Sequence, residues 1–250
     1  VATFLSQWSL PSRPLVDGWS LATIFMCCFL LGPVLALFIA ALGDSGGLWN
    51  HLVETVLATY VINTVFLMVG VGGVAIIFGV SSAWVISRYD FTGRAVLEWM
   101  LLLPAAIPAY IIAYCYTDFF EYAGPVQSAL RAAFGWESPR EYYFPEIRSL
   151  GGAVLVMASV LYPYIYMVTR IAFRLTPVSL FEIALVHDKS QFWHVGLPLA
   201  RPAIVAGLAL VMMEVVSDFG TVEYFAVQTI TLGIFNVWLG MNNLVAAAQI

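Results

Sequence analysis

Long apolar stretches alternate with short polar segments along this chain. Five stretches are of about the length that a bilayer requires, at residues 19–42, 57–86, 95–116, 150–173 and 200–219. A run of roughly 20 apolar residues crosses the hydrocarbon core as a helix, so each stretch predicts a transmembrane span. The apolar run after Thr231 predicts a re-entrant or interfacial piece, followed by the opening of a sixth, truncated span.

The third stretch contains two prolines, and the segments around it are polar. Pro104 and Pro108 lack a backbone N–H and clash with the preceding turn, so they predict a kinked or broken helix. The loop at 117–149 predicts a short surface helix at 126–134. The other long polar segment, residues 175–202, lies between the fourth and fifth stretches and contains its own helical pattern.

Composition places the chain in one class of protein. Hydrophobic residues make up 62%, charged residues 10%, and the mean hydropathy is +0.91. These values predict a polytopic integral membrane protein, and the apolar stretches predict that it is an all-α transmembrane bundle. Residues 1–250 are expected to form one incomplete transmembrane domain. The net charge of −5 does not show the excess of basic residues that is typical of a nucleic-acid-binding protein.

The distribution of basic residues predicts the orientation of the spans. Lysine and arginine are retained in short cytoplasmic loops. With the N-terminus inside, seven of the ten would be cytoplasmic: Arg13, Arg88, Arg94, Arg170, Arg174, Lys189 and Arg201. Only Arg131, Arg140 and Arg148 would be external. The 175–202 segment therefore faces the cytoplasm in this topology.

The 175–202 segment has the pattern of a docking helix. Phe181, Ala184 and Leu185 recur at helical spacing, with Glu182 on the other side. Such a face suits the groove of a soluble partner, although it also suits a helix lying in the headgroup layer. Pro198 and Pro202 predict the turn by which the chain re-enters the membrane.

Two acidic residues fall at membrane depth in the fifth stretch. Glu214 and Asp218 are spaced i, i+4 and should project from one face. Ionisable groups at this depth are costly and often face an aqueous path. One interpretation is a translocation path with hard oxygen ligands suited to ferric iron, with Glu223 and Tyr224 near its outer mouth. The alternative is that Asp218 bonds the backbone near Gly220 while Glu214 contacts another span.

Motifs for bond chemistry are absent from the sequence. It has no GxxxxGK phosphate loop, no HExxH and no clustered cysteines. We therefore predict no catalytic residue, no resident metal, no bound cofactor and no enzyme activity for this chain.

A family resemblance begins in the 175–202 segment. Glu182, Ile183 and Ala184, followed by Gly196, Leu197 and Pro198, resemble the EAA motif of type I, binding-protein-dependent ABC importer permeases, which have the MetI-like fold. The segments LLPAAIPAYIIAY, VLYPYIYMVTRIAF and EVVSDFGTVEYFAVQTITLGIF resemble the ferric-iron branch of these permeases. Three departures are Ile183 in place of the usual Ala, Asp188 near the usual Gly, and a shorter spacing from Glu182 to Pro198.

The resemblance implies a complete transport system around this chain. In that family the EAA motif forms a cytoplasmic coupling helix held by a separate ATPase subunit, which binds the ATP. A periplasmic binding protein delivers the substrate, and a second permease half, fused or separate, completes the pathway. The implied location is the bacterial inner membrane, multi-pass and in contact with lipid. The implied cargo is ferric iron.

Other functions remain open on the sequence. The same fold carries sulfate, polyamines, thiamine and sugars. An ion-coupled secondary transporter would use Glu214 and Asp218 to couple protons or sodium, and would show an inverted repeat, which we do not see. A membrane scaffold would need neither residue for uptake.

Overall fold

The computed structural model describes residues 17–250, and its regular elements within that range are all helices, with no strand. Four helices are long and apolar enough to cross a membrane: α1 (Gly18–Ala41), α3 (Leu57–Arg88), α7 (Leu150–Leu175) and a continuous helix Phe192–Ser217, most of which is α9 (Leu197–Ser217). A bent pair, Arg94–Ala106 and Ala109–Phe134, provides a fifth span if it crosses as one unit. The all-helical, polytopic fold predicted from the sequence is confirmed.

The bent pair is interrupted at Pro104 and Pro108, as predicted. It consists of α4 (Arg94–Met100), the 3-10 turn η2 (Leu103–Ala106), α5 (Ala109–Phe120) and α6 (Pro125–Phe134), and it bends by 100°. Pro104 lies in η2, and Pro108 is the extended residue directly before α5. The missing N–H groups thus fall at helix starts, where they cost little. The α6 helix confirms the surface helix expected at 126–134.

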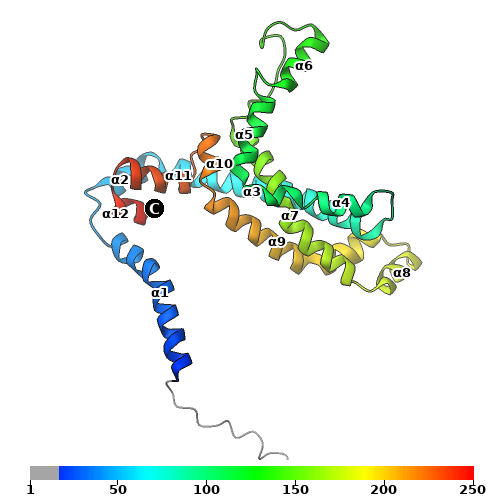
Figure 1. Cartoon of the computed structure of the whole chain (residues 1–250), viewed down its shortest axis with the longest axis horizontal. Helices are drawn as coiled ribbons and strands as arrows, with labels where there is room; N and C mark the ends of the chain where they lie inside the picture. The colour runs from blue at the N-terminus through cyan, green and yellow to red at the C-terminus, as the bar shows by residue number, and fades with distance from the viewer. Residues whose placement is uncertain (1–16) are drawn as a thin grey trace, which may run out of the picture.

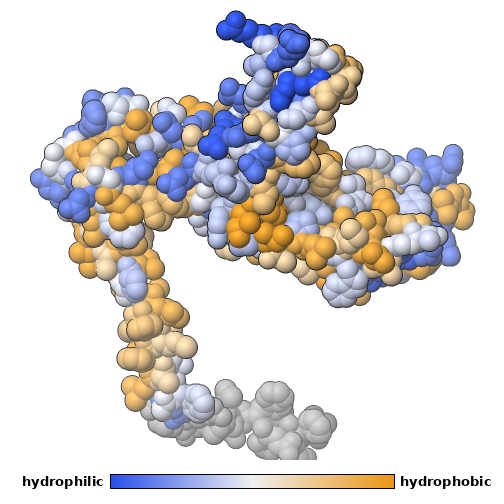
Figure 2. All heavy atoms as spheres, turned by 45° about the horizontal axis from the view of Figure 1, so that its top comes forward, coloured by the Kyte–Doolittle hydropathy of each residue, from blue (hydrophilic) through white to orange (hydrophobic). Residues whose placement is uncertain are grey.

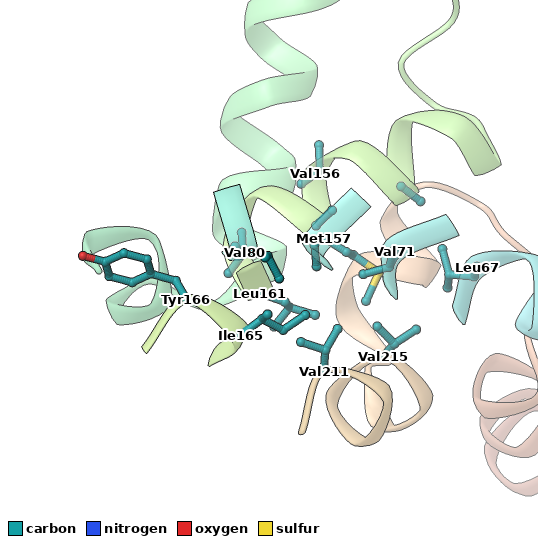
Figure 3. Packing of buried hydrophobic residues seen from close by; sticks show 14 of the residues in the cluster. Leu67, Val71, Val80, Val156, Met157, Leu161, Ile165, Tyr166, Val211 and Val215 are labelled. Carbon is teal, nitrogen blue, oxygen red and sulfur yellow. The ribbon is translucent and has the colours of Figure 1, made fainter. Parts of the chain in front are cut away.

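The core is formed by three spans, with α7 packed against both α3 and α9. Figure 3 shows Val71 and Val80 of α3 meeting Met157 and Leu161 of α7, while Val211 of α9 closes the cluster from the other side. Glycines at the contact let the backbones approach closely, as is usual between membrane helices. The α7 helix is therefore the centre of the bundle.

Each end of the bundle carries a different set of short elements (Figure 1). At one end, which we call the α8 end, lie α8 (Val178–Val186) and the π-helical turn η3 (Phe192–Gly196). The α5–α6 arm rises away from the bundle. At the opposite end lie short helices: α2 (Leu48–Thr55), α10 (Gly220–Tyr224), α11 (Ile230–Phe235), the π-helical turn η4 (Asn236–Gly240) and α12 (Leu244–Gln249).

Most basic residues lie toward the α8 end. They are Arg88, Arg94, Arg170, Arg174, Lys189 and Arg201, whereas Arg131, Arg140 and Arg148 lie between α5 and α7. Arg13 lies outside the described residues. At the α8 end, Glu98 of α4 forms ion pairs with Arg170 and, at 3.0 Å, with Arg174 of α7. This separation agrees with the predicted orientation, which remains a prediction.

The surface of the spans is apolar. Helix α1 stands away from the three-helix core and has no buried residue, and its surface is largely hydrophobic in Figure 2. Its C-terminal end is attached to the short helices, because the Gln249 side-chain amide donates to the Ala41 carbonyl at 3.1 Å. An apolar surface of this extent requires lipid or other membrane helices around it.

One predicted boundary is wrong. The fifth span was expected to begin near residue 200, after a turn made by Pro198 and Pro202, but the helix already runs from Phe192. Pro198 directly follows the wider π-helical turn, in which the Leu197 N–H bonds to the Phe192 carbonyl, so the helix continues through it. Pro202 is tolerated inside the helix.

Candidate functional site

Two regions hold the residues that the sequence singled out: the α8 end of the bundle, and the acidic positions at and after the end of α9. They lie at opposite ends of α9. Within residues 17–250, no group of three or more His, Cys, Asp or Glu side chains could hold a metal ion.

The two sides of α8 differ from the prediction. Phe181 and Ala184 are buried within the chain, whereas Leu185 is 63% exposed. Glu182 and Ile183 also face outward. The expectation that Phe181 and Ala184 contact a partner is therefore wrong, because this side meets the chain's own aromatic residues. The outer side of α8 is Glu182, Ile183 and Leu185, and it is continued by Val186, which is 83% exposed.

Helix α8 ends in a left-handed residue. Asp188 has φ of 55°, the Asp188 N–H donates to the Leu185 carbonyl at 3.0 Å, and the Lys189 N–H donates to the Ala184 carbonyl at 2.8 Å. This is a glycine-type helix cap, in which Asp is tolerated because its short side chain strains the left-handed conformation less than most. Asp188, which lies near the position of the usual Gly in the EAA motif, therefore adopts the backbone conformation that a glycine would favour.

Pro198 does not form the turn predicted for it with Pro202. Gly196 ends η3, and Leu197 and Pro198 begin α9, so all three lie in the continuous helix Phe192–Ser217. Gly196 is buried, and a Cβ there would lie 2.5 Å from Cζ3 of Trp84. The absence of a side chain at Gly196 thus allows η3 to pack on the end of α3.

Glu214 borders an open cavity near the C-terminal end of α9. Its side chain is exposed on α9 and borders a space of about 270 Å³. The other walls are the break between η2 and α5, including Pro108, and the α7 residues Val160, Leu161 and Tyr164. A carboxylate beside an irregular backbone segment is the kind of polar lining that a membrane protein tolerates only around a cavity.

Asp218 is the C-cap residue of α9, and its N–H donates to the Glu214 carbonyl at 3.0 Å. Its carboxylate turns toward α10. It accepts hydrogen bonds from the Thr221 N–H at 2.8 Å, the Thr221 hydroxyl at 2.9 Å and the Val222 N–H at 3.3 Å. The alternative of a backbone-bonding Asp218 matches the structure, whereas a role of Glu214 and Asp218 in a translocation path stays a prediction.

Glu223 and Tyr224 lie on α10 beside α5. They border a cavity of about 530 Å³ together with Tyr110, Tyr114, Ile111 and Gly220. The guanidinium of Arg148 lies 4.9 Å from the Tyr224 ring centroid and pairs with Glu121 at 2.8 Å. This basic residue beside Tyr224 was not singled out from the sequence, since only the fold brings residues 121, 148 and 224 together.

Comparison with known proteins finds a matching family of transport components and several related permeases. The family model for the binding-protein-dependent transport system inner membrane component matches residues 75–248. The chain is similar to the Fe(3+)-transport system permease protein FbpB 2 of Haemophilus influenzae, at 28% identity over 74% of this chain and 33% of that protein. It therefore spans about a third of that relative's length.

Other relatives are named for different substrates. The sulfate transport system permease protein CysT of Escherichia coli is 25% identical over 88% of this chain and 79% of its own length. The molybdenum transport system permease protein ModB of Escherichia coli is 28% identical over 59% of this chain and 62% of its own length. The family is one of transport permeases rather than an enzyme class.

The family match covers well over half of the chain, and the helices are long and apolar enough for a multi-pass inner-membrane protein. The chain belongs to the family of binding-protein-dependent transport system inner membrane components, and it is a permease of the type I ABC importer class.

Proposed function

We propose that this chain forms part of the translocation pathway of an ABC importer and that α8 couples it to a separate ATPase subunit. The observation that carries the proposal is the outer side of α8. Glu182, Ile183 and Leu185 are exposed on a helix whose inner side is firmly packed, at the end of the bundle where most basic residues lie. Exposed apolar side chains on a fixed helix suit a groove in a partner.

The remaining partners follow from the family. A soluble binding protein delivers substrate on the side of the α5–α6 arm, and a second permease half, fused or separate, completes the pathway. The apolar surface of α1 and the outer sides of α3 and α9 face lipid or that second half. ATP is bound and hydrolysed by the ATPase subunit, and this chain carries out no bond chemistry.

The coupling role is tested by charge reversal on α8. We expect Glu182→Lys to insert normally but to lose co-purification of the ATPase in mild detergent, because it changes the partner-facing side without touching a span. Glu137→Lys is the matched control, since Glu137 is an exposed carboxylate between α5 and α7. Equal recovery of the ATPase with wild type and Glu182→Lys would contradict the coupling role.

For the cargo we propose ferric iron. The resemblance to ferric-iron permeases and the similarity to FbpB 2 favour it. The Glu214 carboxylate in the cavity beside Pro108 also favours a cation over an oxyanion. Relatives named for sulfate and molybdenum make these two oxyanions the second candidates, ahead of polyamines and thiamine.

The cargo is tested by uptake into cells that express the complete importer. We expect radiolabelled ferric iron to accumulate, with sulfate and molybdate at background. Glu214→Gln should reduce iron uptake at an unchanged protein level if this carboxylate lines the path. Uptake of an oxyanion instead of iron would leave the importer assignment intact and overturn the cargo.

A further inference from the structure

A single tryptophan joins four helical segments at the α8 end. Trp84, one turn before the end of α3, contacts Phe173 of α7 with ring centroids 5.2 Å apart, Phe181 of α8 at 6.0 Å and Phe192 of η3 at 5.1 Å. The interplanar angles are 81°, 60° and 71°, so all three contacts have the edge-to-face geometry that aromatic pairs favour. We call these four rings the Trp84 cluster.

A cation completes the cluster. Arg88 is the last residue of α3, and its guanidinium carbon lies 3.9 Å from the Phe181 ring centroid and 5.8 Å from that of Trp84. Among residues 17–250, Arg88 forms no salt bridge, and its Nε is buried without a hydrogen-bond partner. The ring faces therefore provide the principal attraction that holds the guanidinium in place.

The return segment from α8 is attached to the same cluster. The Gln191 side-chain amide donates to the Phe181 carbonyl at 3.1 Å, which links the residue before η3 to α8. Gly196 permits the close approach of η3 to Trp84, as described above. Helix α8 is thus held by side chains on its inner side as well as by the chain at both ends.

These contacts give α8 a direct connection to α3. Along the backbone, α8 is joined only to α7 and α9, and its two buried residues are Phe181 and Ala184. Phe181 contacts Trp84 and Arg88, both of α3. Without these two residues, a displacement of α8 would reach α3 only through the packing of α7 and α9.

We propose that Trp84 and Arg88 are positioning residues that make the ends of α3, α7, α8 and α9 move as one unit, so that a displacement of α8 is transmitted directly to α3. The inference rests on the proposed function, because it assumes that an ATPase acts on the outer side of α8. It adds a residue-level route for that displacement, and neither residue belongs to the surface proposed to meet the partner.

The test is the amount of substrate taken up per ATP hydrolysed, measured with the complete importer in proteoliposomes loaded with its binding protein. We expect Trp84→Ala to retain insertion and ATPase binding, while uptake per ATP falls at least about fivefold. Trp84→Phe should restore most of the loss, because it keeps an aromatic edge. Trp99→Ala is the matched control, since Trp99 on α4 is 73% exposed and lies outside the cluster.

A second variant decides the case in which Trp84→Ala fails to assemble. Arg88→Met keeps the length and the apolar stem but removes the cation, and it should also lower uptake per ATP. A wild-type ratio in assembled Trp84→Ala, or in Arg88→Met if the former does not assemble, would overturn the inference. Failure of the wild-type chain to bind any ATPase would instead overturn the proposed function, so the two failures are distinguishable.

Discussion

The three core spans meet around Ile165 of α7, which is fully buried. A Cβ added at Gly79 of α3 would lie 2.9 Å from the Ile165 Cβ and 3.0 Å from the Tyr162 carbonyl oxygen. A Cβ added at Gly207 of α9 would lie 2.8 Å from the Ile165 Cα and 2.9 Å from Val168 Cγ2. Backbone atoms and Cβ atoms cannot rotate away, so either alanine must push two helices apart.

The size of the effect follows from these distances. Carbon atoms pack best at about 3.5–4.0 Å, so each alanine demands a local displacement of about 0.5–1 Å. Overpacking of this kind costs about 1–3 kcal/mol, and alanine regains up to about 1 kcal/mol over glycine in a helix. We therefore expect Gly79→Ala and Gly207→Ala each to lower the free energy of unfolding by about 1–2 kcal/mol. Because both contact Ile165, their effects should not add.

The same helix provides the controls. Gly73 of α3 has no atom within 4 Å of an added Cβ, so Gly73→Ala should leave stability unchanged or raise it slightly. Gly72→Ala should cost little, although its Cβ would lie 2.5 Å from Met212 Cε, because that methyl group is the end of a flexible side chain. Stability would be measured by denaturant unfolding of the purified protein in mild detergent. If the Gly79→Ala and Gly73→Ala variants unfold at the same denaturant concentration, the packing argument is wrong.

Three further predictions concern polar groups. Asp218→Ala should destabilise the protein by about 1 kcal/mol by removing the cap of α10, whereas Asp218→Asn should be close to wild type; loss of uptake in a fully stable Asn variant would contradict this structural role. Asp188→Gly should be neutral or stabilising by up to about 1 kcal/mol, because it relieves a left-handed non-glycine residue, and a lower unfolding midpoint would count against it. Glu98→Gln should lower the free energy of unfolding in detergent by about 1–3 kcal/mol, because it removes the counter-charge of the partly buried Arg170 and of the more exposed Arg174, and an unchanged midpoint would show that the ion pairs contribute nothing.

The spans and the break in the third could be predicted because they depend on local properties. Twenty or so apolar residues in a row require a helix in lipid, whatever their neighbours. Pro104 and Pro108 interrupt a helix through their own covalent structure. The start of the fifth span was placed too late, since Pro198 was taken as part of a turn although it lies in the first turn of α9.

The sequence could not predict which side of α8 packs against the rest of the chain and which side faces outward. Helical spacing groups Phe181 with Ala184, but it does not say what that side meets. Trp84 of α3, which is distant in sequence, covers this side together with Phe173 of α7 and Phe192 of η3. The direction of the Asp218 carboxylate could not be predicted for a similar reason. A spacing of four residues groups Glu214 with Asp218, but it does not reveal that this carboxylate accepts hydrogen bonds from Thr221 and Val222 of α10.

The sequence alone therefore determined the class of the protein, its membrane spans, the position of the polar loop between two of them and, by resemblance, its family. Hydrophobic length, proline chemistry and motif spacing act within one segment, so they can be read without a fold. The tertiary structure alone decided which side of α8 is free, which acidic residue lines a cavity, and how Trp84 and Arg88 join α8 to α3. These properties depend on contacts between segments far apart in the chain, and such contacts exist only once the helices have packed.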